Sequence, residues 1–384
     1  MSTAAPRGAA IWGTDCRRPG AGAASATLRP VPIRAALAYT ARHPRAVSSA
    51  FAMDPTTASL PANPLPAPAL RLTRLRFDCD ALEPIHLPAY SGSAWRGLIG
   101  RSLRHSVCVT RQPTCDGCLL RSQCAYSTFF ESPPASPETA ARYSALPHPF
   151  VLEPGPPGRR TLEPGAPLSV GLTLIGPAGA LTPYLIHALQ RAGARGLGRQ
   201  GGRFRLVAVQ QETRLGSDQW QAIYRAETAT LQPAATQLPA PGAAPDQVRL
   251  ALHTPVRLKR QGRYLGPRDL DARALLGTLS TRIALLAELY GDGPPAFERA
   301  PLHAAIDRIT LTPAQLHWVE WTRYSSRQGT RMQLGGVLGT LQLHGPGLTA
   351  LWPLLTLGQW LHVGKATSFG LGGYRLQPAA SPDP

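Results

Sequence analysis

One pattern occurs twice in this chain, and no other feature restricts the possible folds as strongly. It consists of an apolar segment with helical spacing, a glycine-rich loop and a short strand. The first copy spans residues 181–206, and the second spans residues 348–376. Internal repetition at a domain-sized spacing is typical of related structural units. The sequence therefore predicts two related domains.

The residues around the first copy are predicted to form one βαββαβ unit. Residues 70–81 alternate between polar and apolar side chains, as in a half-buried strand. A helix should follow, with Ser93 as its N-cap and an apolar face of Ala94, Leu98, Ile99 and Leu103. The remaining elements are expected as strands at 150–152 and 168–175, a helix from Thr182 and a strand at 204–209. This order is that of a ferredoxin-like domain.

The second half repeats the scheme. A strand is expected at 248–258, a helix at 270–290, strands at 306–311 and 316–322, and a strand pair at 332–343, before the second copy of the pattern. The fold class is therefore α+β, with two tandem ferredoxin-like (RRM-like) βαββαβ domains at 66–210 and 247–384. A linker rich in Pro, Ala and Gly is expected at 211–246.

Residues 1–65 are expected to be a disordered or mis-annotated N-terminal extension. Seven arginines and a single acid, Asp15, occur before Met53. An organellar transit peptide shares this composition, but a mis-assigned start upstream of Met53 also explains it and is favoured here. No secretory signal is visible, which favours a cytoplasmic protein.

The chain is strongly basic, with a net charge of +18 and 40 Lys+Arg against 22 Asp+Glu. Such a charge attracts polyanions, and arginine forms bidentate contacts with phosphate. A GC-rich genome would explain the preference for arginine over lysine, but it would not explain the excess over acids. No uncharged apolar run reaches the ~18 residues of a membrane span. The composition favours nucleic acid as the partner and excludes a membrane protein.

The two glycine loops do not fit known nucleotide-binding motifs. Residues 196–201 match G-x-G-x-x-G, but a helix precedes them and a strand follows, the reverse of a dinucleotide site. The dipeptide Gly364-Lys365 lacks the preceding residues of a P-loop. A simple helix-to-strand turn explains both loops. Phosphate binding is favoured because arginines surround the first loop, at Arg191, Arg195, Arg199, Arg203 and Arg205.

Four cysteines form a compact group with the spacing C-x6-C-x2-C-x5-C: Cys108, Cys115, Cys118 and Cys124. Four thiolates with a C-x-x-C element suit tetrahedral zinc, and we expect a structural zinc site inserted in the first domain. An iron–sulfur cluster also uses four cysteines. Disulfides are the other alternative, which a reducing compartment disfavours.

Polar and aromatic side chains gather in the second half. Residues 323–328 follow an aromatic strand at 318–321, and they combine guanidinium, hydroxyl and amide groups that suit an RNA backbone. A solvated hairpin loop would look the same. Among the histidines, His362 stands three residues before Lys365, and imidazole titrates near neutrality, which suits proton transfer.

Over residues 70–376 the sequence resembles the CRISPR-associated endoribonucleases that process precursor CRISPR RNA, the sixth Cas family of the RAMP superfamily. The resemblance rests on residues 83–88 with 92–97, on Phe129-Phe130-Glu131 after the cysteines, on 323–328 with Leu334-Gly335-Gly336, and on the terminal segment 364–374. The last matches the superfamily's glycine-rich RNA-binding loop.

The resemblance implies metal-independent cleavage in which a ribose 2′-OH attacks the adjacent phosphate, leaving 2′,3′-cyclic phosphate and 5′-OH ends. Our hypothesis takes His362 as general base or acid, Tyr324 and Ser326 as orienting groups, and Lys365 as the phosphate-stabilising charge. His86 and His105 are reserves, since a histidine near the first helix serves some relatives. The candidates for RNA binding are Arg96, Arg101, Arg195, Arg199, Arg203, Arg323, Arg327, Gln328, Gly364, Gly370, Gly372 and Gly373.

The implied partners are CRISPR repeat RNA and other Cas effector subunits. A non-catalytic RAMP subunit that holds CRISPR RNA in an effector complex is the alternative function, because it would use the same loops and arginines. A zinc-knuckle DNA-binding regulator is a weaker alternative, since no helix-turn-helix pattern is present.

Overall fold

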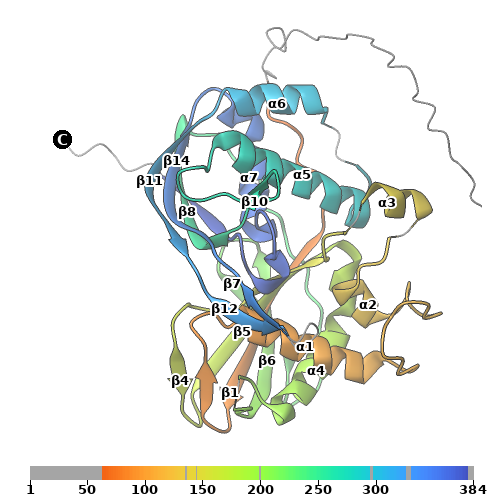
Figure 1. Cartoon of the computed structure of the whole chain (residues 1–384). Coiled ribbons are helices and arrows are strands. Elements are labelled where there is room, and N and C mark those ends of the chain that lie inside the picture. Colours follow the sequence, from red (N-terminus) through yellow and green to blue (C-terminus); the bar gives the residue numbers. More distant parts are fainter. Residues whose placement is uncertain are drawn as a thin grey trace, which may run out of the picture. The chain divides into compact units, whose positions relative to one another are not determined.

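The computed structural model describes residues 63–134, 136–143, 145–198, 200–294, 297–325 and 330–378, with residues 323–325 and 330–332 described as backbone only. Two antiparallel sheets with helices on them make up this part of the chain (Figure 1). The predicted α+β class is therefore confirmed. No helix of the described residues is long and apolar enough to cross a membrane.

The first sheet has five strands in the order β3-β5-β1-β6-β7. Its strands are β1 (Leu72–Ala81), β3 (Phe150–Glu153), β5 (Pro167–Ile175), β6 (Phe204–Arg214) and β7 (Gln219–Arg225). Phe77, at the centre of β1, pairs with Val170 of β5 and Val209 of β6, and all three are buried. The apolar alternation along β1 thus sets the register of the sheet.

Helices α1 (Gly92–Val107) and α4 (Thr182–Arg195) pack beside each other on this first sheet (Figure 1). Each buries an apolar face, with Leu98, Ile99 and Leu103 on α1 and Leu185 and Leu189 on α4. Two shorter helices follow α1, namely α2 (Ala125–Phe130) and α3 (Pro137–Arg142). The last turns of α1 and α4 carry the arginines that matter for the site.

The second sheet has four strands in the order β11-β14-β8-β15. They are β8 (Gln247–Val256), β11 (Thr310–Val319), β14 (Gly336–His344) and β15 (Tyr374–Pro378). The helices of this half are α5 (Ala272–Tyr290), α6 (Arg299–Asp307) and α7 (Leu348–Leu361). Asp271 caps α5 by accepting a hydrogen bond from the Ala274 amide at 2.7 Å.

Three short ribbons and two 3₁₀ turns complete the described structure. The ribbons pair β2 (Ile85–Leu87) with β4 (Arg160–Leu162), β9 (Lys259–Arg260) with β10 (Arg263–Tyr264), and β12 (Thr322–Ser325) with β13 (Thr330–Gln333). The turns are η1 (Gly176–Leu181) and η2 (Thr367–Phe369). Both copies of the repeated pattern therefore form helix, loop and strand: α4 to β6, and α7 to β15.

The structure departs from the sequence-based boundaries in several places, among them the start of α1 at Gly92, which puts the expected N-cap Ser93 inside the helix, and β11, which is one strand where two were expected. Residues 299–307 form helix α6, so the strand expected from Ile306 begins only at Thr310. The first sheet continues through β7, inside the segment assigned to the linker. Leu65, assigned to the N-terminal extension, is buried, and its amide donates to the Ala350 carbonyl at 2.9 Å. Residues 1–62 of that extension lie outside the described residues.

Candidate functional site

The closing glycine loop contacts the first half of the chain. A Cβ on Gly92 would lie 2.0 Å from the Phe369 carbonyl oxygen, and a Cβ on Gly370 would lie 2.7 Å from the Leu152 carbonyl oxygen. The Tyr90 hydroxyl donates to the Phe369 carbonyl at 2.6 Å. The start of α1 and the loop before β15 therefore pack closely against each other; this contact is called the joint below. The close backbone approach explains why Gly92 and Gly370 lack a Cβ, without any need for a bound ligand.

The amides of this loop are already used within the protein. The Gly370 N–H donates to the Thr367 carbonyl at 2.8 Å, that of Gly372 to the Pro255 carbonyl at 3.0 Å, and that of Gly373 to the Thr254 hydroxyl at 2.7 Å. All three glycines are buried. The amide hydrogens of these three glycines are therefore already donated within the protein, while RNA binding by the loop stays a prediction.

Arg96 belongs to the same joint. Its Nε donates to the Ser368 hydroxyl at 3.2 Å, and its guanidinium lies 4.5 Å from the Phe369 ring centre and 5.2 Å from that of Phe130. A second nitrogen lies 3.3 Å from Nε2 of His148. Arg96, predicted to bind RNA, thus holds the two halves together.

His362 lies inside the protein at the C-terminal end of α7. Its side chain is 3% exposed, and its Nδ1 donates to the Leu371 carbonyl at 3.0 Å. Burial and the neighbouring His253 lower its pKa to about 3. The ring, together with Tyr90 and Glu153, lines a cavity of about 510 Å³ between the two halves. His362 is therefore neutral at physiological pH and shielded from an RNA strand on the surface.

Lys365 points to solvent, unlike His362. The residue is exposed, and its amide donates to the Arg257 carbonyl at 3.0 Å. Gly364, with φ of +86°, bridges to Arg257, and a Cβ there would lie 2.5 Å from the Arg257 carbonyl oxygen. Lys365 is exposed whereas His362 is buried, so the two side chains lie in different environments, and their joint action on one phosphate stays a prediction.

Several candidates from the polar cluster cannot be placed. Arg323 and Tyr324 lie in β12, where only their backbone is described, and Tyr324 pairs with Arg331 of β13. Ser326, Arg327, Gln328 and Arg199 lie outside the described residues.

A basic hollow of about 390 Å³ surrounds His105, in the last turn of α1. It is lined by Arg101 and Arg104 of α1, Cys108, Arg111 and Gln112 of the following loop, and Arg195 of α4. His105 is exposed, and the charge of Arg195, followed by desolvation and the charges of Arg191 and Arg111, lowers its pKa below the usual value. The hollow thus combines a neutral imidazole with fixed positive charge.

The arginines of the hollow differ in the contacts that they make within the protein. Arg104 donates to the Pro113 carbonyl at 2.8 Å and to the Gln112 carbonyl, and so holds the loop after α1. Within the described part of the chain, no ion pair joins Arg101, Arg111 or Arg195 to a carboxylate. These three can therefore meet an incoming phosphate without first breaking a salt bridge.

His86 and Arg203 lie at the first glycine loop. His86 is exposed in β2, where its Nδ1 lies 3.0 Å from the Thr161 hydroxyl, and a Cβ on Gly198 would lie 2.7 Å from the His86 carbonyl oxygen. The guanidinium Nε of Arg203 donates to Glu83 at 2.7 Å. RNA binding by Arg203 would have to displace this carboxylate, so it is a weaker candidate than Arg195.

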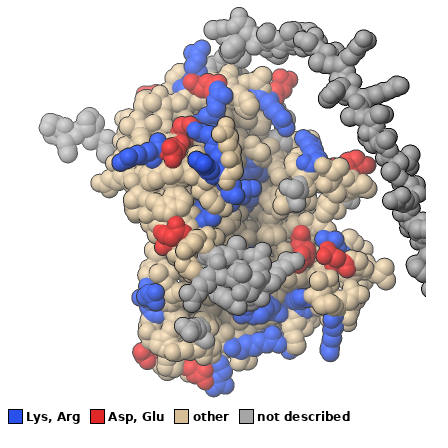
Figure 2. All heavy atoms as spheres, in the orientation of Figure 1, with Lys and Arg blue, Asp and Glu red and all other residues tan. Residues whose placement is uncertain are grey.

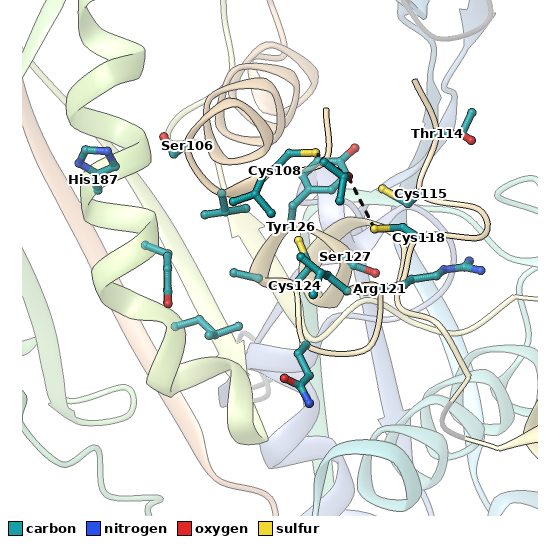
Figure 3. A pocket seen from close by; sticks show the side chains of 18 of the residues that line it. Ser106, Cys108, Thr114, Cys115, Cys118, Arg121, Cys124, Tyr126, Ser127 and His187 are labelled. Carbon is teal, nitrogen blue, oxygen red and sulfur yellow. Dashed lines mark hydrogen bonds between the residues drawn. The ribbon is translucent and has the colours of Figure 1, made fainter. Parts of the chain in front are cut away.

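The four cysteines line one cavity of about 640 Å³, and Figure 3 shows their sulfurs around the same space. The Thr110 hydroxyl lies 3.8 Å from both Cys108 Sγ and Cys118 Sγ. Burial and Glu131 raise the pKa of the Cys115 thiol, and neighbouring Cys124 and Cys108 raise it further. None of the four is in a disulfide. Among the described residues no three potential ligands are close enough to share a metal ion, so the side chains as placed do not fit a formed metal centre.

Sequence reasoning named Arg191 as a phosphate-binding candidate but did not predict that Arg111, Arg191 and Gln112 lie near His105. The spacing of Arg191 and Arg195 carried a usable signal, because residues four apart lie on one face of a helix. Arg111 and Gln112 come from an irregular loop. Arg111 has a positive φ of 50°, which no sequence pattern predicts. The contact between α1 and α4 arises from tertiary packing, which no local sequence pattern predicts.

Two family models match this chain. Residues 250–374 match the model described as the CRISPR-associated endoribonuclease Cas6, and residues 70–236 match a model described as an N-terminal domain. No curated protein matches the chain.

Solved structures of similar fold include Thermus thermophilus Cas6, at 16% identity over 80% of this chain and 99% of that chain, with a TM-score of 0.47. A Cas6 product complex has 19% identity over 80% of this chain and 99% of that chain, with a TM-score of 0.47. A partial Cas6-RT-Cas1–Cas2 complex has 16% identity over 82% of this chain and 47% of that chain, with a TM-score of 0.48.

Proposed function

We propose that the chain is an endoribonuclease of the CRISPR-associated Cas6 family and that it cuts precursor CRISPR RNA in the hollow around His105. The observation that carries the site is geometric: exposed His105 lies in a hollow lined by Arg101, Arg111 and Arg195, which make no ion pair within the described residues. The charge of Arg195 also lowers the pKa of His105. A neutral imidazole can take a proton, and fixed guanidinium groups can hold the phosphate beside it.

The proposed chemistry is an intramolecular transfer that needs no metal ion. His105 accepts the proton of the ribose 2′-OH, and the 2′ oxygen attacks the adjacent phosphorus. The bond to the 5′ oxygen of the next nucleotide breaks, and that oxygen takes up a proton. The products are a 2′,3′-cyclic phosphate and a 5′-OH end. Arg195 and Arg101 stabilise the charge that develops on the phosphate oxygens.

In each half we propose a ferredoxin-like domain. The second sheet supports this with the spatial order β11-β14-β8-β15, in which the first strand of the unit lies between the third and the fourth. The first sheet has the same arrangement, β3-β5-β1-β6, with β7 added at one edge. In each unit, helical segments connect the first strand to the second and the third strand to the fourth, which is the order βαββαβ.

The proposed partners are CRISPR repeat RNA and other Cas proteins. Exposed arginines at the ends of α1 and α4 support an RNA partner. Among other Cas proteins, Cas1 and Cas2 are the first to test for association, since one of the compared structures is a Cas6-RT-Cas1–Cas2 complex.

The enzyme is tested with its own repeat RNA in EDTA, beside the same RNA carrying a deoxynucleotide at the scissile position. We expect cleavage of the natural RNA in EDTA, because protein groups supply the charge. The deoxy RNA should remain intact, since it lacks the attacking hydroxyl. Cleavage of the deoxy RNA would contradict attack by the 2′-OH. Loss of all cleavage in EDTA, with recovery when a divalent ion is added, would contradict the proposal that no metal ion is needed.

For the cysteine loop we propose a structural zinc ion, supported by the four thiols around one cavity (Figure 3). Closing the loop around an ion would require the thiols to move, since they are not gathered at ligand distance in the described structure. We expect about one zinc per chain in reducing buffer, lost in Cys118→Ser and kept in Cys79→Ser. Cys79 is the matched control because it is buried in the sheet, away from the loop. Equal metal content in both variants would contradict the proposal.

A further inference from the structure

We infer that the exposed β9–β10 hairpin and Lys365 form a second binding surface, which takes a single-stranded RNA segment flanking the one that is cut. The inference rests on the proposed function, and it names a contact surface on the half of the chain opposite to His105. The surface consists of Lys259, Arg260, Arg263, Tyr264 and Lys365.

The hairpin is a tight turn that displays its side chains to solvent. Gln261 and Gly262 form its tip with φ of 50° and 83°, as in a two-residue hairpin turn. Arg263 pairs with Arg260 and Tyr264 pairs with Lys259. Every residue from 259 to 264 is exposed. Figure 2 shows lysine and arginine side chains, with acidic ones among them, over the part of the molecule where Figure 1 places β10 and α5.

Tyr264 presents an aromatic ring held from behind by a buried cation. The ring is 40% exposed and lies 4.1 Å from the guanidinium carbon of Arg257, which is only 5% exposed. Arg257 is fixed because it donates to the Gly335 carbonyl. A phenol kept in place in this way can stack a base at little cost in side-chain entropy.

Lysines stand at both ends of the surface, and they are the two lysines of the whole sequence. Lys259 is exposed with its Nζ 4.7 Å from the Tyr264 ring centre, so it can move aside for a base and meet the phosphate. Lys365 adjoins the hairpin because its amide donates to the Arg257 carbonyl at 3.0 Å. Arg260 contributes less, since it pairs with Asp271.

This combination suits a single strand better than a duplex. Proteins that bind single-stranded RNA stack bases on aromatic side chains and follow the phosphates with lysine and arginine. A duplex offers no exposed base face for Tyr264. The hairpin and the His105 hollow belong to different halves of the chain. An RNA strand that reached both would therefore be bound at the scissile phosphate and also at a flanking segment.

The test measures binding of a fluorescent oligouridine and of the natural repeat RNA to the full chain by anisotropy. We expect Tyr264→Ala to weaken oligouridine binding roughly 5- to 150-fold, and Tyr264→Phe to bind like wild type, because stacking needs the ring and not the hydroxyl. The double variant Lys259→Ala/Lys365→Ala should lower the slope of affinity against salt by about two phosphate contacts. Arg299→Ala, an exposed arginine on α6, is the matched control and should change neither quantity.

Two results would overturn the inference. One is oligouridine binding by Tyr264→Ala equal to wild type. The other is a Tyr264→Phe variant as weak as Tyr264→Ala, which would mean that the ring acts through its hydroxyl and not by stacking. Circular dichroism of each variant separates lost binding from lost folding. Cleavage of the repeat by the wild-type chain is scored separately, so failure of the enzyme proposal is seen in a different measurement from failure of this surface.

Discussion

Replacing His105 with alanine is expected to reduce the single-turnover rate of repeat cleavage by roughly 10²- to 10⁴-fold, the usual contribution of a positioned general base. RNA affinity should change little, because the surrounding arginines remain. The measurement is cleavage at saturating enzyme, combined with anisotropy for binding. The matched control is His303→Ala, an exposed histidine on α6 in the other half of the chain.

The pH profile gives this prediction a second readout. The charges of Arg195, Arg191 and Arg111 lower the pKa of His105, so the base stays neutral to a more acidic pH than an ordinary histidine. In Arg195→Ala the largest of these causes is removed, and the acidic limb of kcat/KM should move to higher pH. An unchanged limb in Arg195→Ala, or a His105→Ala rate equal to that of wild type, would mean that another group is the base.

Comparing cleavage by the His362→Ala and His105→Ala variants also tests whether His362 is catalytic or structural. Its burial and its bond to the Leu371 carbonyl suit a structural role at the end of α7. A His362→Ala variant that folds normally yet loses cleavage while His105→Ala retains it would restore the sequence-based hypothesis.

Periodicity predicted the regular elements well because it reports burial directly. The helical face of Leu98, Ile99 and Leu103 and the alternation around Phe77 are both buried as expected. Helix α6 was missed because the run from Ile306 to Thr312 is rich in β-branched residues. In the structure Leu302 and Ile306 are buried on one face of α6, and the strand begins only at Thr310, so burial outweighs the strand propensity of the first residues in this run.

The function of the glycines could not be predicted from the sequence. Two of them have positive φ angles, 91° at Gly370 and 81° at Gly372, which glycine adopts without strain. A pattern of glycines shows that some backbone or ligand atom approaches closely, but it does not show which one. In this fold the Val363 carbonyl oxygen would lie 1.9 Å from a Cβ on Gly372, so the protein itself fills the space. Similarly, the arginines around His105 meet only through the packing of α1 on α4.

The largest expected effect on stability comes from Arg74, near the start of β1. Its guanidinium donates to both oxygens of Glu153, at 2.9 and 2.7 Å, and to Glu212 at 2.9 Å. Glu212 is fully buried, and Arg74 keeps 14% of its side chain exposed. Burial alone would raise the pKa of Glu153, but the hydrogen bonds and charge of Arg74 outweigh it and lower that pKa to about 2.

Arg74→Met should therefore lower the free energy of unfolding by about 3–5 kcal/mol at pH 7, because two carboxylates lose their counter-charge inside the protein. In wild type, the contribution of Glu153 is present above its unfolded pKa and lost as pH falls towards 2. In the variant the folded pKa of Glu153 rises above the unfolded one, so acidification protonates it and stabilises the fold. The gap between the two proteins should thus narrow from pH 7 to pH 5 in urea denaturation. Arg205→Met is the control, since its pair with Asp80 is 67% and 31% exposed and should cost less than about 1 kcal/mol. Equal losses in the two variants, or a gap that widens at pH 5, would show that Arg74 does not neutralise these carboxylates.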